Sequence, residues 1–168
     1  MKKKNLLRTI VGVMMIHATA LHGLQLMSRA FGPNEHIPIK YTCDGENSAP
    51  HLSWKNAPAN TKSFALICDD PDAPMAEPFV HWVIFNIPAA EDHLRERVGI
   101  QGGTSADTVG YYGPCPPAGK PHRYIFTLYA LDTILPLQEG ATKEELLAAM
   151  KNHILEQASL IGLYQRKK

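Results

Sequence analysis

Three short stretches of this chain carry side chains that could do chemistry together. They are residues 70–74 (Asp-Pro-Asp-Ala-Pro), residues 81–82 (His-Trp), and residues 122–124 (His-Arg-Tyr), which follow a run rich in glycine and proline. Together they supply carboxylates, imidazoles, a guanidinium and a phenol. Such a mixture of hydrogen-bonding groups suits a small anion, such as a phosphate headgroup.

The histidine of the second stretch lies within an apolar run, where a lone histidine more often serves as a hydrogen-bonded core residue. A carboxylate at hydrogen-bond distance would raise the pKa of this histidine and fix its tautomer. We therefore expect Asp70 to orient His81, and His81 to contact the anion. Asp70 and Asp72 share one side if strand geometry persists, but aspartates also commonly cap turns.

The third stretch begins a predicted strand at residues 122–131. Alternation places His122 and Tyr124 on one face, where both can donate to one ligand, and Arg123 on the other face, where we expect a structural ion pair. The long segment 99–121 is rich in glycine and proline, and loops of this length are usually functional or disordered. We expect this segment to form an ordered wall of the site.

Strands must position these groups. Residues 63–69 form a continuous apolar run, typical of a strand buried on both faces, and residues 79–87 are aromatic and β-branched. Residues 37–60 indicate short strands with turns at 44–45 and 56–60. The proline-rich turn after residue 70 is rigid, and the Ala73–Pro74 bond is a candidate for the cis form.

The C-terminal region changes period and predicts a helix. Thr142 and Glu145 form a capping box, and Gly162 is a plausible stop. The expected apolar face recurs every four residues, at Leu146, Met150, Ile154 and Ala158. A second short helix is expected at residues 91–96. Strands dominate, so we predict a mainly β fold, with two antiparallel sheets packed as a sandwich and a C-terminal helix.

Length and charge indicate one globular domain, residues 21–168, after a leader of 20 residues. The net charge is +1, but the first 20 residues are basic and the remainder carries a small excess of acidic side chains. An acidic body argues against a nucleic-acid partner, which normally requires a basic face.

The leader itself is typical of a cleavable signal peptide. It has lysines at positions 2–4, a short apolar run at 10–16 and Ala-Thr-Ala at 18–20. The apolar run is shorter than the roughly 20 residues that span a bilayer, so we expect no stable membrane span. These features predict a periplasmic or secreted protein. The alternative is an N-terminal amphipathic helix, which would leave the chain cytoplasmic.

Three cysteines cannot all pair with one another. Cys68 lies in an apolar run and is expected to be a buried small hydrophobe. Cys43 and Cys115 both lie in loops and could form a disulfide in an oxidising compartment. No Cys-x-x-Cys motif is present.

In combination these motifs resemble the phosphatidylethanolamine-binding protein family, also called Raf kinase inhibitor-like proteins, and most closely its bacterial branch. The matching segments are residues 41–47, 52–54, 61–66, 69–74, 81–88, 110–117 and 122–124. The resemblance implies a β fold with two antiparallel sheets and a small anion pocket at one end. The ligand-binding residues that it implies are Asp70, His81, Gly113, Pro117, His122 and Tyr124, with the pocket shaped by Asp72, Pro74 and Trp82.

Two segments depart from the family pattern. Ala49-Pro50 stands where bacterial members usually carry Ser-Pro, and residues 104–107 lack the expected asparagine and aromatic residue. The pocket is expected to persist, with a different rim.

The leading hypothesis is a binding protein without enzymatic activity, for a ligand such as phosphate or phosphoethanolamine. We expect no catalytic residue, no metal and no cofactor, since no hydrolase or metalloprotease motif occurs. One alternative is a protein inhibitor or interaction module that acts through its surface. A less favoured one is a hydrolase or metal enzyme that uses the same cluster. The protein partner and the presence of a homodimer stay open.

Overall fold

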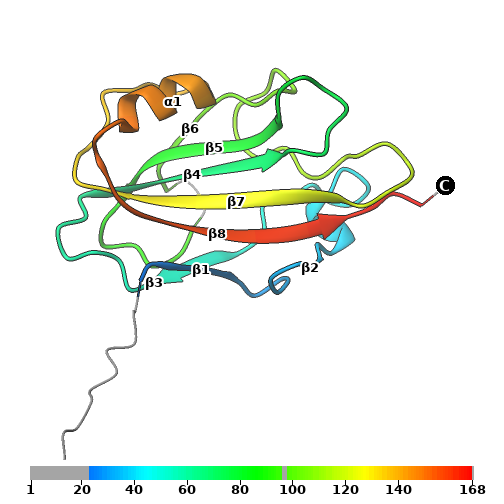
Figure 1. Cartoon of the computed structure of the whole chain (residues 1–168), viewed down its shortest axis with the longest axis horizontal. Helices are drawn as coiled ribbons and strands as arrows, with labels where there is room; N and C mark the ends of the chain where they lie inside the picture. The colour runs from blue at the N-terminus through cyan, green and yellow to red at the C-terminus, as the bar shows by residue number, and fades with distance from the viewer. Residues whose placement is uncertain (1–22, 96–97, 168) are drawn as a thin grey trace, which may run out of the picture.

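Two β-sheets pack face to face and form the body of the molecule (Figure 1). The computed structural model describes residues 23–95 and 98–167. The larger sheet has six strands in the order β2-β8-β7-β4-β5-β6, and the smaller sheet pairs β1 with β3. The strand bounds are β1 (Gln25–Ser28), β2 (Glu35–His36), β3 (Leu52–Lys55), β4 (Ser63–Asp70), β5 (Phe79–Pro88), β6 (Ile100–Gln101), β7 (His122–Leu131) and β8 (Ile154–Tyr164).

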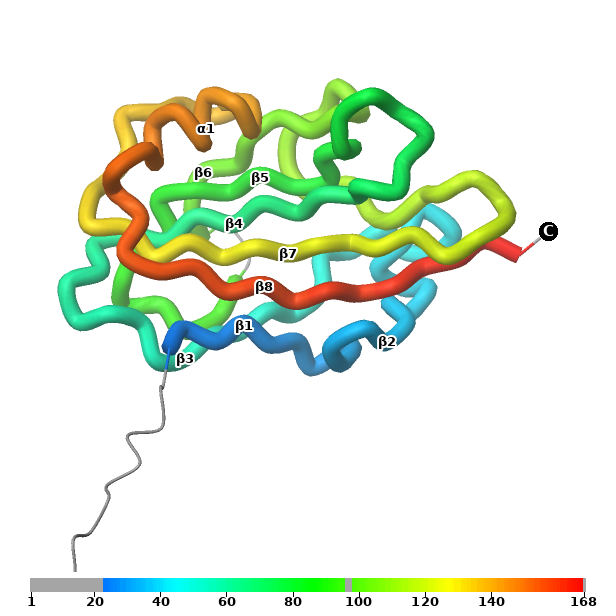
Figure 2. Tube along the Cα trace, viewed as in Figure 1, coloured from blue at the N-terminus to red at the C-terminus, as the bar shows by residue number. Residues whose placement is uncertain are grey.

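The predicted sandwich of two sheets is confirmed, and its pairings are antiparallel except that of β2 with β8, which is parallel. Strands β4, β7 and β8 run side by side through the middle of the molecule, and the C-terminus lies at the opposite end from the start of β1 (Figure 2).

The central strand β4 is buried on both faces, as its apolar run predicts. Phe64 and Leu66 pack in the core shared with the small sheet. Ala65 and Ile67 belong to a second core on the opposite face, which is covered by helix α1 (Lys143–Met150). The prediction that Cys68 is buried is also confirmed.

The predicted C-terminal helix is right at its start and wrong after Met150. The capping box of Thr142 and Glu145 is present, but the helix ends at Met150 and residues 154–164 form strand β8. Asn152 adopts a positive φ of 67°, a conformation that ends helices and that asparagine tolerates. β8 then pairs with β7 along nearly its whole length.

Three smaller expectations also differ from the structure. Residues 91–95 form no helix; instead His93 bridges to Ser53 of β3. The Ala73–Pro74 bond is not cis. Residues Ile39–Tyr41 form a 3-10 turn, η1, where a short strand was expected, whereas the strand at Leu52–Lys55 is confirmed.

A disulfide joins Cys43 to Cys115, with their Cα atoms 5.4 Å apart. It ties the loop that follows η1 to the glycine- and proline-rich segment that precedes β7. The signal peptide predicted at residues 1–20 lies outside the described residues. Within the described part of the chain, no helix is long and apolar enough to cross a membrane.

Candidate functional site

A small cavity of about 180 Å³ lies where β4 ends and β5 and β7 begin. Five of the residues that the sequence analysis singled out line it: Asp70, Pro74, His81, Pro117 and His122. β4 lies between β5 and β7 in the sheet, so the carboxylate from β4 meets one histidine from each neighbouring strand. The remaining lining residues are Ala73, Met75, Phe79, Tyr112, Cys115 and Pro116.

Asp70 orients a histidine, but that histidine is His122, so the expectation that it would be His81 is wrong. The Nδ1 atom of His122 lies 2.7 Å from Oδ2 of Asp70, and both side chains are largely buried. The other carboxylate oxygen, Oδ1, accepts the backbone N–H of Asp72 at 2.8 Å. Both oxygens of Asp70 are therefore occupied, and Nε2 of His122 is the ring atom left for a ligand.

His81 is held by the backbone of the cavity wall. Its Nδ1 lies 2.7 Å from the carbonyl oxygen of Tyr112, which can only accept, so Nδ1 carries the proton. Burial lowers the pKa of His81 below its usual value, although the backbone and Asp70 oppose this shift. The ring is therefore neutral at neutral pH, with the lone pair on Nε2. In the strand pairing, a register shift between Cys68 and Asp69 leaves His81 without a partner on β4.

Tyr124 lies behind the cavity and does not line it. Its ring meets the ring of His81 edge-on at 5.0 Å, and its hydroxyl has no hydrogen-bond partner in the described part of the chain. Burial and the nearby carboxylate of Asp70 raise the pKa of Tyr124, so its hydroxyl stays protonated. Tyr124 supports His81 and offers a buried donor.

The other predicted residues also lie beside the cavity and do not line it. Asp72 forms an ion pair with Arg123 at 2.8 Å, as expected for Arg123, and this pair lowers the pKa of Asp72 to about 2. Trp82 points to the opposite side of β5 and lines a different groove. Gly113 donates its backbone N–H to Oδ1 of Asn47, and a Cβ at this position would lie 2.5 Å from that oxygen.

Of the wall expected at residues 99–121, Tyr112 and residues 115–117 line the cavity, whereas Ile100–Gln101 form strand β6 and Tyr111 lines a different groove. The N–H of Tyr112 donates to the carbonyl of His81, and the N–H of Cys43 donates to the carbonyl of Pro114. The wall is therefore fastened to β5 on one side and, through the Cys43–Cys115 disulfide, to the loop after η1 on the other.

Sequence reasoning missed the aromatic lining of the cavity. The rings of Phe79 and Tyr112 lie 4.8 Å and 5.9 Å from that of His81. Phe79 could have been found, since it precedes His81 by two positions on the same strand and therefore shares its face. Among the described residues, no group of three or more histidine, cysteine or acidic side chains could hold a metal ion.

Comparison with known proteins places this architecture in a family. The family model for phosphatidylethanolamine-binding proteins matches residues 27–165. The chain belongs to the phosphatidylethanolamine-binding protein family. This match spans all ten described elements except the first two residues of β1.

Relatives and solved structures agree with this assignment. A UPF0098 protein of Methanothermobacter thermautotrophicus is 52% identical over 152 residues, which cover 85% of this chain and 99% of the relative. A phosphatidylethanolamine-binding protein homologue of Chlamydia trachomatis, CT736, superposes with a TM-score of 0.82 at 39% identity, covering 86% of this chain and 99% of that chain. E. coli YbcL, described as a member of the mammalian family, superposes with a TM-score of 0.81 at 29% identity over the same shares.

Proposed function

We propose that this phosphatidylethanolamine-binding protein family member binds a small phosphate-containing anion, such as phosphate or phosphoethanolamine, and does not transform it. The observation that carries the proposal is the pair of histidines that line the cavity, each held through Nδ1 by a different group. His122 is oriented by a carboxylate through Nδ1, whereas His81 is neutral and holds its Nδ1 proton on a backbone carbonyl.

These two histidines complement a phosphate that titrates near neutral pH. The second pKa of a phosphate ester is about 6, so both the singly and doubly charged forms are present near neutrality. The Nε2 atom of His122 would contact the anion, while Asp70 holds the ring through Nδ1. The Nε2 atom of His81 would accept a hydrogen bond from the protonated oxygen of the singly charged phosphate. Asp70 then acts behind His122, which explains a carboxylate in an anion site.

The size and lining of the cavity support binding without turnover. A volume of about 180 Å³ lies below the ~300–1,000 Å³ of pockets for drug-sized ligands, so it suits a headgroup. No serine or threonine lies among the described residues that line it, and its one cysteine is held in a disulfide. A serine, threonine or free cysteine nucleophile is therefore absent from the described part of this lining.

The test is calorimetric titration of the full chain with inorganic phosphate and, separately, with phosphoethanolamine. We expect His81→Ala and His122→Ala each to weaken binding at least tenfold. A higher affinity for phosphoethanolamine would indicate a lipid headgroup, and equal affinities would indicate the phosphate alone.

The matched control is His153→Ala. His153 also holds an aspartate through Nδ1, 2.8 Å from Asp132, but it lies at the other end of β7 from His122 and is half-exposed. Its loss should leave binding unchanged. Undiminished binding in the His81→Ala, His122→Ala double variant, or no binding by the unmodified chain, would overturn the proposal.

A further inference from the structure

A second and larger hollow backs onto the anion cavity. The backbone of Tyr112 is hydrogen-bonded to that of His81 on β5, and in each segment two neighbouring residues line different hollows. Tyr112 and His81 line the anion cavity, whereas Tyr111 and Trp82 line a groove of about 500 Å³. This volume lies within the ~300–1,000 Å³ typical of pockets for small organic ligands.

Two partly exposed tyrosine rings, those of Tyr41 and Tyr111, line this groove, and the buried ring of Trp82 lies against Tyr111. The hydroxyl of Tyr111 donates to the backbone carbonyl of Tyr41 at 2.7 Å, and the Tyr111 ring meets the Trp82 ring edge-on at 5.2 Å. Ile84 and Leu94 are buried beneath the groove, so its exposed apolar surface is that of the tyrosine rings. Because these contacts exist without any ligand, a bound molecule need not order the rings, and less affinity is lost on binding.

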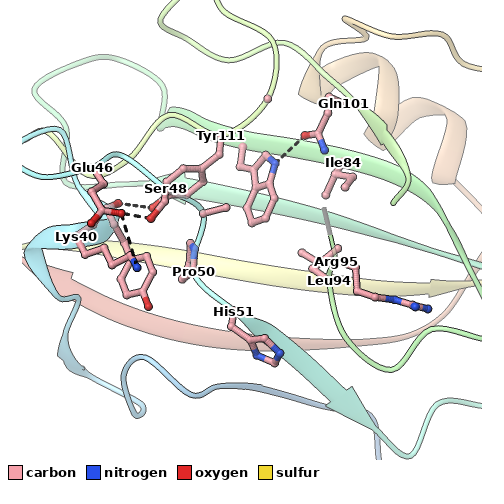
Figure 3. A pocket seen from close by; sticks show the side chains of 14 residues that line it. Lys40, Glu46, Ser48, Pro50, His51, Ile84, Leu94, Arg95, Gln101 and Tyr111 are labelled. Atoms are coloured by element: carbon pink, nitrogen blue, oxygen red, sulfur yellow. Dashed lines mark hydrogen bonds and ion pairs between the residues drawn. The ribbon is translucent and has the colours of Figure 1, made fainter. Parts of the chain in front are cut away.

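Trp82 also holds one side-chain amide in place. The indole N–H of Trp82 donates to Oε1 of Gln101 at 2.9 Å (Figure 3). This bond fixes the side-chain amide, and its NH₂ group donates to no residue in the described ranges. Gln101 thus brings a positioned hydrogen-bond donor to the groove, beside an apolar surface.

The charged side chains of the groove are already matched by carboxylates. Lys40 lies 3.7 Å from Glu46 at one end (Figure 3), and Arg95 pairs with Glu91 at the other. Both cations face a carboxylate, so a ligand with net charge would have to compete for them. The groove therefore favours an uncharged ligand, in contrast to the cavity behind it.

We propose that this groove binds an uncharged saccharide of one to three pyranose rings. A pyranose has a face of C–H groups that packs against aromatic rings, and a rim of hydroxyls that both donate and accept hydrogen bonds. The NH₂ group of Gln101, the hydroxyl of Ser48 and the exposed Lys40–Glu46 pair match such a rim. An acyl chain would fill the apolar part but would leave these polar groups without partners, which is costly where water is displaced.

Tryptophan fluorescence gives a direct test, because the chain contains two tryptophans and only Trp82 lines this groove. In a Trp54→Phe variant, all tryptophan emission comes from Trp82. The probes are maltotriose, N,N′,N″-triacetylchitotriose and, as the competing chemistry, dodecanoate. We expect at least one trisaccharide to change the emission saturably, and calorimetry on the unmodified chain to give the same affinity.

Two variants separate the groove from the rest of the protein. Tyr111→Ala and Gln101→Leu should each weaken saccharide binding at least tenfold. Gln157→Leu, which changes an exposed glutamine on β8, should leave it unchanged. Saturable binding of dodecanoate without either trisaccharide would overturn the saccharide assignment. The absence of binding by all three probes, in fluorescence and in calorimetry, would overturn the site itself. Neither result depends on phosphate binding in the other cavity.

Discussion

Removing the Cys43–Cys115 disulfide should cost this fold a large part of its stability. The bond closes a loop across a sequence separation of 72 residues. In the chain-entropy description, a cross-link over a loop of this length removes enough freedom from the unfolded chain to stabilise the fold by about 4 kcal/mol. A small domain has only ~5–15 kcal/mol in total, so the effect should be easy to measure.

The measurement is equilibrium unfolding in urea, on the full chain with and without a dithiol reductant. With a denaturant dependence of about 2 kcal/mol per molar urea, the midpoint should fall by about 2 M. Cys115 lines the anion cavity, so reduction should also weaken phosphate binding in calorimetry. The Cys43→Ser, Cys115→Ser variant is the control, because the reductant should change neither its midpoint nor its affinity. An unchanged midpoint after verified reduction of the unmodified chain would refute this account of the disulfide.

Three further changes test the packing, the wall and the buried histidine. Met150 lies on the buried face of α1, so Met150→Ala should lower the free energy of unfolding by about 2–5 kcal/mol. Leu147→Ala, on the exposed side of the same helix, should have a much smaller effect. Equal losses in urea unfolding would contradict the assigned helix face. Gly113→Ala brings a Cβ within 2.5 Å of Oδ1 of Asn47, so both the thermal midpoint and phosphate affinity should fall, and a variant unchanged in both would show that the wall can yield. Burial lowers the pKa of His81 below 6.5, so at acidic pH the folded chain binds fewer protons than the unfolded chain. The free energy of unfolding should therefore be undiminished by His81 above pH 6.5 and should decline as pH falls below it. His81→Gln should flatten the dependence of the thermal midpoint on pH between about 7.5 and 5.

The sequence predicts the strands that carry the site because their patterns are local. Residues 63–69 form an apolar run that only burial on both faces explains, and β4 occupies Ser63–Asp70. The aromatic and β-branched run at 79–87 becomes β5, and the alternation at 122–131 becomes β7. The family pattern likewise indicated which segments would meet.

The C-terminal error shows where a periodic pattern is ambiguous. A spacing of four residues fits a helix face, but four is also a multiple of two, the period of a strand. Ala158 and Gly162 therefore lie on one face in either structure, whereas a register shift between Ala130 and Leu131 offsets Ile154 from them. Pairing with β7 decides in favour of the strand, and this pairing is not visible from local sequence. Asn152 was the local signal for an early helix end.

The partner of Asp70 could not be predicted for a similar reason. Asp70 ends β4, which has a neighbour on each side, and each neighbour carries a histidine close to its start. Only the order and register of the strands determine that the carboxylate reaches His122 and that His81 lies at a register shift. These are properties of the assembled sheet.

The position of β8 has a consequence for the time course of folding. The last of the described strands, β8, lies in the interior of the large sheet, between β7 and β2, and its partner β2 comes from near the start of the described residues. Until residues 154–164 are available, β7 presents an unpaired edge and the core beneath it stays open. The sheet therefore closes only when its two ends in sequence have met, a contact of long sequence separation that slows folding. A nascent chain of this protein should remain unfolded until residues 154–164 have left the ribosome.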